Sequence, residues 1–171
     1  MDLRDRIRNI ADFPKPGVMF RDITPLLSDP KYFERAIFMM EDKLSGLEFS
    51  AFAGAESRGF VVGAPLALKM SKPFIPVRKA GKLPYEVCRA EYELEYGRAV
   101  VEMHVDAIKP GDRVVVVDDL LATGGTARAI CGMIEKLGGN VAALLFLIEL
   151  EALGGRLALD GYDIRAVLSY P

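Results

Sequence analysis

The valine run at residues 114–117 is the clearest element in the hydrophobic pattern, since four apolar residues follow one another without interruption. Such a run is typical of a strand buried on both faces of a parallel sheet. Pro110-Gly111-Asp112 supplies a turn before it. Further short apolar runs predict strands at 49–55, 74–78 and 141–148.

Apolar residues recur at helical spacing between these runs and predict helices over about 31–44, 59–70 and 127–137. Asp29-Pro30 fits the start of the first helix as an N-cap and first-turn proline, and Gly138-Gly139 fits the end of the last. Strands that alternate with helices predict an α/β fold with a central parallel sheet.

Three segments depart from this alternation. Leu3, Ile7 and Ile10 recur at helical spacing and predict a helix at the amino end. Residues 82–96 are polar and rich in tyrosine and glutamate, and residues 98–105 alternate as an antiparallel strand would, so we interpret the pair as a hairpin-like flap. Glu102 and His104 share one face of that strand and are expected to face solvent.

Length and composition favour one compact domain over residues 1–171, of which 51% are hydrophobic. With 22 basic and 24 acidic residues the net charge is −2, which argues against a general nucleic-acid surface. No stretch reaches the roughly 20 apolar residues of a membrane span, and Cys88 and Cys131 are too few for a disulfide framework. We therefore expect a cytoplasmic protein without nucleic-acid or membrane partners.

The candidate chemistry follows the valine run. Asp118 and Asp119 come at its carboxyl end, where open α/β sheets bind ligands. Behind them, residues 122–126 read Ala-Thr-Gly-Gly-Thr and open a helix. Glycines allow close backbone approach, and a helix amino end offers unpaired N–H groups to a phosphate. This segment predicts a site for a sugar phosphate, although either half alone also fits a solvated turn or an ordinary helix cap.

Two other nucleotide-binding motifs do not fit the loop. A P-loop would carry Gly-Lys-Ser or Gly-Lys-Thr, and a dinucleotide site would carry GxGxxG. Residues 114–126 instead resemble the PRPP-binding signature of the type I phosphoribosyltransferases, where PRPP is 5-phosphoribosyl 1-pyrophosphate. The chain also resembles the purine-using members of this family at four separate segments, residues 13–25, 54–60, 78–84 and 92–97.

This resemblance implies a five-stranded parallel sheet flanked by helices. A small hood, from about residues 1–28 and the C-terminal segment, and a flexible flap at about 82–98 would lie over its carboxyl edge. The implied reaction is a purine-salvage transfer in which adenine and PRPP give AMP and pyrophosphate in a homodimer, with Mg²⁺ bound mainly through PRPP and not by an all-protein metal site. Two alternatives stay open: a transferase for xanthine or a 6-oxopurine, and a non-catalytic regulator that senses PRPP.

The resemblance also implies roles for individual residues. Asp118 and Asp119 would meet the ribose hydroxyls, and the loop would hold the 5′-phosphate. The loop residues are Ala122, Thr123, Gly124, Gly125 and Thr126. The implied pyrophosphate ligands are Ser57, Arg58, Lys79 and Lys82, with a cis peptide expected between Glu56 and Ser57.

For the base, the family pattern implies that adenine stacks on Phe20 and meets the backbone of Met19 and Arg21. A backbone N–H and C=O pair would match the N1 acceptor and N6 donor of adenine and mismatch a 6-oxopurine. Glu95 corresponds to the general acid or base of the family, and Tyr96 beside it would close over the site. The catalytic residues expected are therefore Glu95, Asp118 and Asp119.

Overall fold

The computed structural model describes residues 1–93 and 98–171. The chain divides into two compact units, Met1–Met39 and Met40–Pro171. No helix in the part of the chain described is both long enough and apolar enough to cross a bilayer.

The amino-terminal unit is built from short elements. They are a 3₁₀ helix η1 (Leu3–Arg6), strands β1 (Arg8–Ile10) and β2 (Phe20–Asp22), helix α1 (Thr24–Leu27) and most of helix α2 (Pro30–Asp42). β1 and β2 pair antiparallel. The helix expected from Leu3, Ile7 and Ile10 is wrong after its first turn, because the backbone becomes extended at Ile7 and continues into β1.

Helix α2 confirms the longest helix expected in this region. The Asp29 carboxylate accepts a hydrogen bond from the Lys31 backbone N–H at 3.1 Å, and the Asp29 carbonyl accepts from Phe33 at 2.9 Å. Asp29 therefore caps the helix as its position before a proline indicates.

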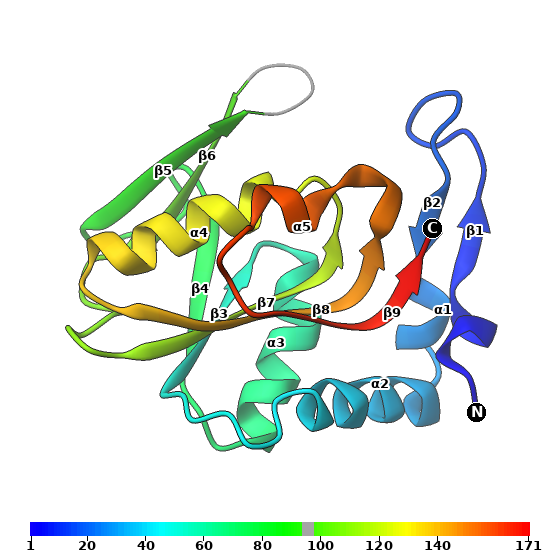
Figure 1. Cartoon of the computed structure of the whole chain (residues 1–171), viewed down its shortest axis with the longest axis horizontal. Helices are drawn as coiled ribbons and strands as arrows, with labels where there is room; N and C mark the ends of the chain where they lie inside the picture. Colours follow the sequence, from blue (N-terminus) through cyan, green and yellow to red (C-terminus); the bar gives the residue numbers. More distant parts are fainter. Residues whose placement is uncertain (94–97) are drawn as a thin grey trace. The chain divides into compact units, whose positions relative to one another are not determined.

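The second unit contains the main sheet. Its strands are β3 (Ala51–Ala55), β4 (Phe74–Lys79), β5 (Val87–Glu93), β6 (Arg98–His104), β7 (Arg113–Leu121), β8 (Asn140–Leu150) and β9 (Ile164–Tyr170). Among the described residues they form a seven-stranded sheet in the order β5-β6-β4-β3-β7-β8-β9 (Figure 1). Five neighbouring strands of this sheet, in the order β4-β3-β7-β8-β9, are mutually parallel, which confirms the expected core sheet.

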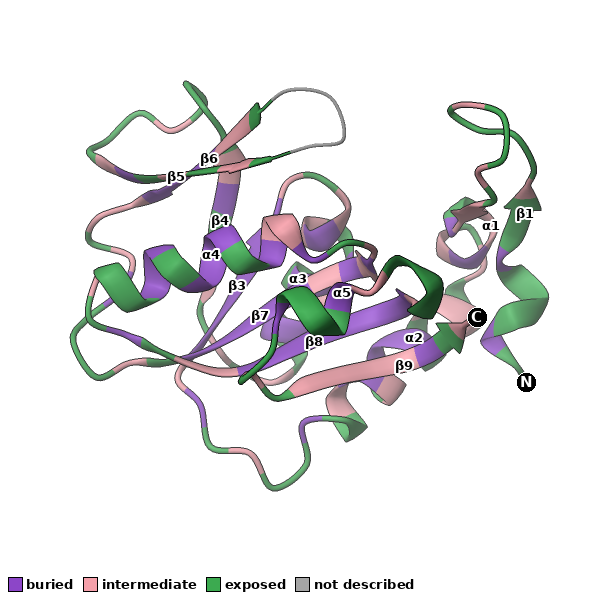
Figure 2. Ribbon diagram, turned by 45° about the horizontal axis from the view of Figure 1, so that its top comes forward, coloured by how far each residue is buried: buried purple, intermediate pink, exposed green. Residues whose placement is uncertain are grey.

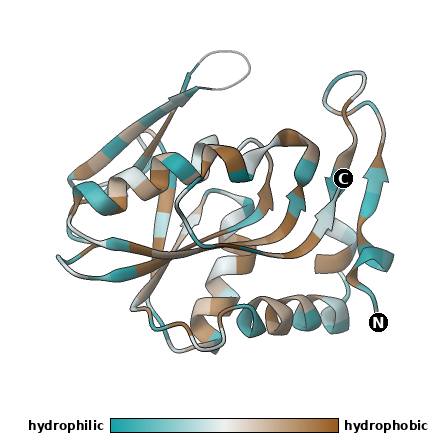
Figure 3. Ribbon diagram, in the orientation of Figure 1, coloured by the Kyte–Doolittle hydropathy of each residue, from teal (hydrophilic) through white to brown (hydrophobic). Residues whose placement is uncertain are grey.

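Helices cover both faces of this sheet. α3 (Arg58–Lys69) packs on one face, and α4 (Gly125–Lys136) packs on the other with the short helix α5 (Gly155–Ala158), which follows the 3₁₀ helix η2 (Glu151–Leu153) (Figure 1). The central strands β3, β7 and β8 are buried almost throughout (Figure 2). Helix α4 carries both hydrophobic and hydrophilic residues (Figure 3), and its buried residues are apolar, as in an amphipathic helix packed on a sheet.

The predicted flap is present as an antiparallel hairpin. β5 pairs with β6 from Val87 opposite His104 to Glu93 opposite Arg98, and β6 pairs antiparallel with β4. The mixed sheet therefore extends the parallel one by two strands. The expectation that Glu102 faces solvent is wrong, since its side chain is only 1% exposed. The Nε2 atom of His104 is also buried.

Candidate active site

The two adjacent aspartates lie near the carboxyl end of β7. Strands β3 and β8 lie on either side of β7; Asp119 is only 3% exposed, and Asp118 is half-buried. They line a cavity of about 340 Å³ whose wall also includes Ser57, Arg58 and Lys79. Small-molecule sites usually measure roughly 300–1,000 Å³, so the cavity suits one modest ligand.

Charge inside this cavity is poorly solvated. Burial raises the pKa of Asp118 well above its ordinary range, and the neighbouring charge of Asp119 raises it further. Burial also raises the pKa of Asp119, although Arg58 opposes this effect through an ion pair of 3.2 Å between Nε and Oδ2. The Asp119 backbone N–H donates to Asp118 Oδ1 at 2.8 Å. The two acids thus lie in contact in the wall of the cavity, and the charge of one opposes ionisation of the other.

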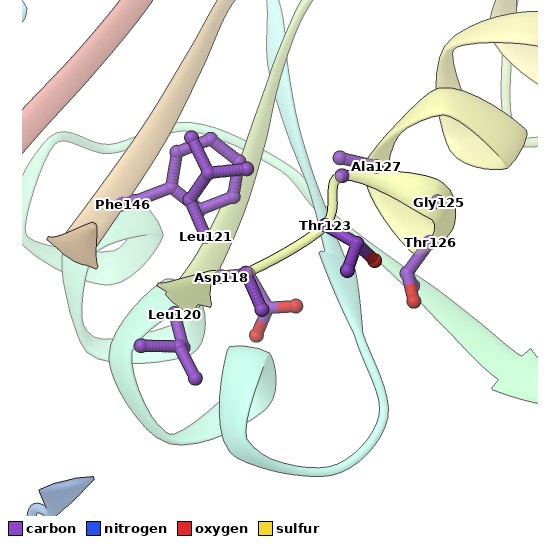
Figure 4. Close-up of a pocket in the computed structure, with 10 residues that line it drawn as sticks. Asp118, Leu120, Leu121, Thr123, Gly125, Thr126, Ala127 and Phe146 are labelled. Atoms are coloured by element: carbon purple, nitrogen blue, oxygen red, sulfur yellow. The ribbon is translucent and has the colours of Figure 1, made fainter. Parts of the chain in front are cut away.

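The Thr-Gly-Gly-Thr loop connects β7 to α4 and encloses a second, smaller pocket of about 80 Å³. Gly124 has a φ of +86°, which a residue with a side chain rarely adopts, and its carbonyl accepts the Arg128 N–H at 2.9 Å in the first turn of α4. Figure 4 shows Asp118, Thr123 and Thr126 pointing to one side of the loop, whereas Leu121 and Phe146 point to the other. Hydroxyls and a helix amino end on one side suit an anion.

The two pockets adjoin, because Asp118, Leu120, Ala122 and Thr126 line both. The structure thus brings the five predicted loop residues next to the aspartate pair. It also brings Ser57, Arg58 and Lys79 to the lining of the larger cavity. A ligand with a phosphate at each end of a sugar would find polar groups along this whole path.

The segment after β3 carries the expected cis peptide between Glu56 and Ser57. Glu56 itself was not predicted as a functional residue, yet it lines the cavity and contacts three groups from the end of β4 and the turn after it. It accepts hydrogen bonds from Arg78 Nε and from the Lys79 backbone N–H, each at 3.2 Å, and it pairs with the ammonium of Lys82. These partners lower its pKa, the Lys82 contact most. Lys82 therefore contacts Glu56 and is not among the residues that line the cavity.

The cavity is not strongly basic. Its wall holds the carboxylates of Glu56, Asp118 and Asp119 against the cations of Arg58 and Lys79. Within residues 1–93 and 98–171, no three His, Cys, Asp or Glu side chains are grouped to hold a metal ion. A polyanionic ligand would therefore need to carry part of its own charge compensation.

The residues predicted to contact the base lie in the amino-terminal unit or outside the described residues. Met19, Phe20 and Arg21 belong to the amino-terminal unit, where Phe20 packs edge-on against Phe13 with ring centroids 5.1 Å apart. Glu95 and Tyr96 lie outside the described residues.

Tyr92 on β5 lines the cavity and was not predicted as a site residue. A Cβ added to Gly125 would lie 3.4 Å from the Tyr92 ring, so β5 runs close to the start of α4. Alternation along the strand indicates which face Tyr92 occupies, but only the fold reveals that α4 lies on that side.

Comparison with known proteins agrees with the geometry. The model of the phosphoribosyl transferase domain family matches residues 26–167. The chain is 50% identical over 170 residues to the adenine phosphoribosyltransferase of Kosmotoga olearia, a match that covers 99% of this chain and 100% of that one.

Solved structures are equally similar. The crystal structure of adenine phosphoribosyltransferase from Thermoanaerobacter pseudethanolicus has a TM-score of 0.96 and 51% identity, with 98% of each chain covered. The enzyme from Saccharomyces cerevisiae, in complex with an imino-altritol 1,6-bisphosphate and adenine, has a TM-score of 0.92 and 37% identity over 97% of this chain and 96% of that chain.

Proposed function

The chain belongs to the phosphoribosyl transferase domain family, and we infer that it acts as an adenine phosphoribosyltransferase of purine salvage. In this activity the ribose 5-phosphate of PRPP is transferred to adenine, which gives AMP and pyrophosphate. The observation that carries the inference is the pair of adjoining pockets, whose lining brings together a phosphate loop, two aspartates and the cations of Arg58 and Lys79.

We assign the smaller pocket to the 5′-phosphate of PRPP. The backbone N–H groups at the start of α4 and the hydroxyls of Thr123 and Thr126 supply donors, and no lysine is needed. Ala122, Gly124 and Gly125 complete the loop and leave room for the phosphate oxygens. This contact fixes one end of the sugar in the cavity.

Asp118 and Asp119 are assigned to the ribose hydroxyls. As pyrophosphate leaves, the anomeric carbon becomes oxocarbenium-like, and catalysis then depends on placement and on stabilisation of charge. The buried carboxylate of Asp119 acts strongly on a nearby positive centre, because water screens it little. The two aspartates would thus both orient the ribose and favour its developing charge.

Arg58, Lys79 and the backbone of Ser57 are assigned to the pyrophosphate, with Lys82 as a further cation. Arg58 supports this assignment best, since it lines the cavity and pairs with Asp119 at 3.2 Å. Lys82 would have to exchange its contact with Glu56 for one with the ligand.

Mg²⁺ fits this site as part of the substrate. Three carboxylates and two cations line the cavity, so free PRPP would add a large negative charge to a nearly balanced wall. Bound with PRPP, Mg²⁺ would supply part of the charge compensation that this wall does not provide. The aspartates then hold the sugar hydroxyls, and Arg58 and Lys79 hold the remaining anionic oxygens.

For adenine we propose stacking on Phe20 and edge contacts with the backbone of Met19 and Arg21. The relative from S. cerevisiae binds adenine together with a sugar bisphosphate analogue, which supports one site for both substrates. Glu95 is proposed as the general acid or base, with Tyr96 closing over the base. A Glu95→Gln variant with full turnover would remove that role.

A homodimer is proposed on the basis of α3. Val61, Ala64 and Leu68 are exposed at helical spacing, and Leu68 is 83% exposed. An apolar helix face of this kind is suited to burial against a second copy. Sedimentation of the wild type and of Leu68→Asp tests this, because a wild type that is monomeric throughout the micromolar range would contradict it.

A cytoplasmic location is also proposed, supported by the two free, buried cysteines.

The decisive experiment measures Mg²⁺-dependent turnover of PRPP with adenine, hypoxanthine, guanine and xanthine in parallel. We expect product from adenine alone. Turnover of another base would leave the PRPP site standing and overturn the proposed base contacts. Binding of PRPP without turnover of any base would indicate a sensor instead of an enzyme.

A further inference from the structure

Four charged residues form a row across neighbouring strands near the pyrophosphate side of the cavity. Glu56 follows β3, Arg78 lies on β4, Glu102 on β6 and Arg89 on β5, which is the order of these strands in the sheet. Glu102 is the direct partner of Arg78 in the β4–β6 pair and of Arg89 in the β5–β6 pair. Directly opposed residues in antiparallel strands share a face, so opposite charges alternate along one side of the sheet.

Glu102 is the most buried member of this row, with 1% of its side chain exposed. Its Oε2 accepts a hydrogen bond from the Gly81 backbone N–H at 2.9 Å, and its Oε1 forms an ion pair of 2.7 Å with Arg89 Nε. The side chain of Arg89 is 66% exposed. A carboxylate buried so deeply is costly unless its partners stay in place, so its contacts indicate where the fold needs order.

The Gly81 contact is one of several that side chains make to a single short turn. Arg78 Nη1 donates to the Lys82 carbonyl at 3.3 Å, and Glu56 accepts from the Lys79 backbone N–H at 3.2 Å. Glu102 holds Gly81, which lies between these two residues. The end of β4 and the turn after it are thus held at three points by the side chains of Glu56, Arg78 and Glu102.

We propose that Glu102 is a positioning residue for pyrophosphate: it fixes the turn that carries Lys79 and Lys82, and through Arg89 it links this turn to flap strand β5. The inference rests on the pyrophosphate site proposed above. Glu102 is not among the residues that line the cavity, so it acts through its contact with Gly81. A donor held in place before the ligand arrives loses less freedom on binding, so the contact increases affinity for pyrophosphate.

The test titrates magnesium pyrophosphate into the wild type and into Glu102→Gln, Arg89→Gln and Glu91→Gln variants by calorimetry. Glu91 is the matched control, because it pairs with Arg98 on the same hairpin at 3.7 Å while both side chains are well exposed. Glu102→Gln keeps the shape and removes the charge. We expect it to weaken pyrophosphate binding and raise the KM for PRPP about tenfold, which corresponds to about 1.4 kcal/mol.

Three comparisons separate positioning from general stability. The KM for adenine should stay within about twofold of the wild type in Glu102→Gln, and the Gly81 amide should exchange faster with solvent. Arg89→Gln, at an exposed residue, should weaken pyrophosphate binding about threefold, because it removes one of the two partners of Glu102. Glu91→Gln should behave as the wild type.

The inference is overturned if Glu102→Gln lowers the melting temperature but binds pyrophosphate as the wild type does. If Glu102→Gln does not fold, Arg89→Gln decides, and unchanged pyrophosphate binding in that variant overturns the inference. A wild type that binds no magnesium pyrophosphate would overturn the proposed pyrophosphate site and this inference with it. If the wild type binds magnesium pyrophosphate and Glu102→Gln binds it equally well, this inference is overturned and the proposed pyrophosphate site stands.

Discussion

Glu149 and Arg156 form a two-point pair in which Arg156 Nε and Nη2 each donate to one carboxylate oxygen at 2.7 Å. Glu149 lies near the end of β8, directly opposite Leu121 of β7, and is only 4% exposed. Arg156 belongs to α5 and also donates to the Ile164 carbonyl at 3.1 Å. The pair therefore holds α5 at the end of the sheet, next to the strand that leads into the phosphate loop.

Removal of the guanidinium should weaken both the fold and the PRPP site. Arg156→Gln leaves a buried carboxylate without its cation, and we expect the free energy of unfolding to fall by about 2–3 kcal/mol. The KM for PRPP should rise, since α5 no longer supports the loop. Chemical denaturation and steady-state kinetics measure the two effects. Arg98→Gln, which breaks the exposed pair with Glu91, should change neither.

Close packing between α5 and the phosphate loop gives a second prediction. A Cβ on Gly155 would lie 2.4 Å from the Ala122 carbonyl oxygen, so Gly155→Ala must displace the loop. We expect a loss of about 1–3 kcal/mol in stability and a higher KM for PRPP.

Gly132 is the matched glycine for this experiment. It is exposed within α4, and a Cβ there would meet nothing within 4 Å. Gly132→Ala should raise stability by up to about 1 kcal/mol, because alanine favours helix, and should leave the KM unchanged. Equal kinetics in both alanine variants would show that α5 does not position the loop.

The aspartate pair predicts an unusual dependence of stability on pH. Burial raises the folded-state pKa of Asp118 well above its ordinary value of 3.8, and Asp119 raises it further. Between those two pKa values the folded chain holds a proton that the unfolded chain has lost. The free energy of unfolding therefore falls as pH rises through this interval, and the loss is complete above the raised pKa.

Asp118→Asn should abolish this penalty and most of the activity together. We expect the variant to be more stable than the wild type at pH 8 by about 1 kcal/mol or more, or about 2–4 °C in Tm for each kcal/mol, with little difference near pH 4. Thermal unfolding at the two pH values measures this. The exposed Asp160→Asn should show no such change, and a gain for Asp118→Asn that is equal at both values would contradict the explanation.

Most of the sheet and its main helices could be predicted because their signals are local. Continuous apolar runs predict β3, β4, β7 and β8 to within a few residues, and helical periodicity does the same for α2, α3 and α4. β9 was missed because it is an edge strand, where Arg165 and Ser169 interrupt the pattern. At the amino end, the spacing of Leu3 and Ile7 fits a helix, yet the backbone turns extended at Ile7.

The residues of the candidate site likewise include some that the sequence predicts and some that only the fold reveals. The residues of the phosphate loop and the aspartate pair could be predicted because they are contiguous in the sequence. Glu102 was expected in solvent because alternation along β6 says only which face it occupies. Its burial depends on Gly81 and Arg89, which come from other segments of the chain. Likewise, the pairing of Glu56 with Lys82 joins residues 26 positions apart, and no local pattern encodes it.

Arg58 belongs to the proposed pyrophosphate site and also contacts Asp119 of the proposed ribose site. Its replacement should therefore change both pyrophosphate binding and the pKa of Asp119. The guanidinium lines the cavity and pairs with Asp119, whose pKa it lowers against the effect of burial. Arg58→Gln should weaken the binding of magnesium pyrophosphate at least about tenfold. It should also raise the pKa of Asp119, which carboxyl carbon chemical shifts can follow through a pH titration. Arg58→Lys should restore part of the pKa effect but less of the affinity, because an ammonium cannot make the two-point contact of a guanidinium. Arg35→Gln, at an exposed residue of α2, serves as the control and should alter neither quantity. Wild-type affinity for pyrophosphate in Arg58→Gln would remove Arg58 from the site, even if the Asp119 titration moved as expected.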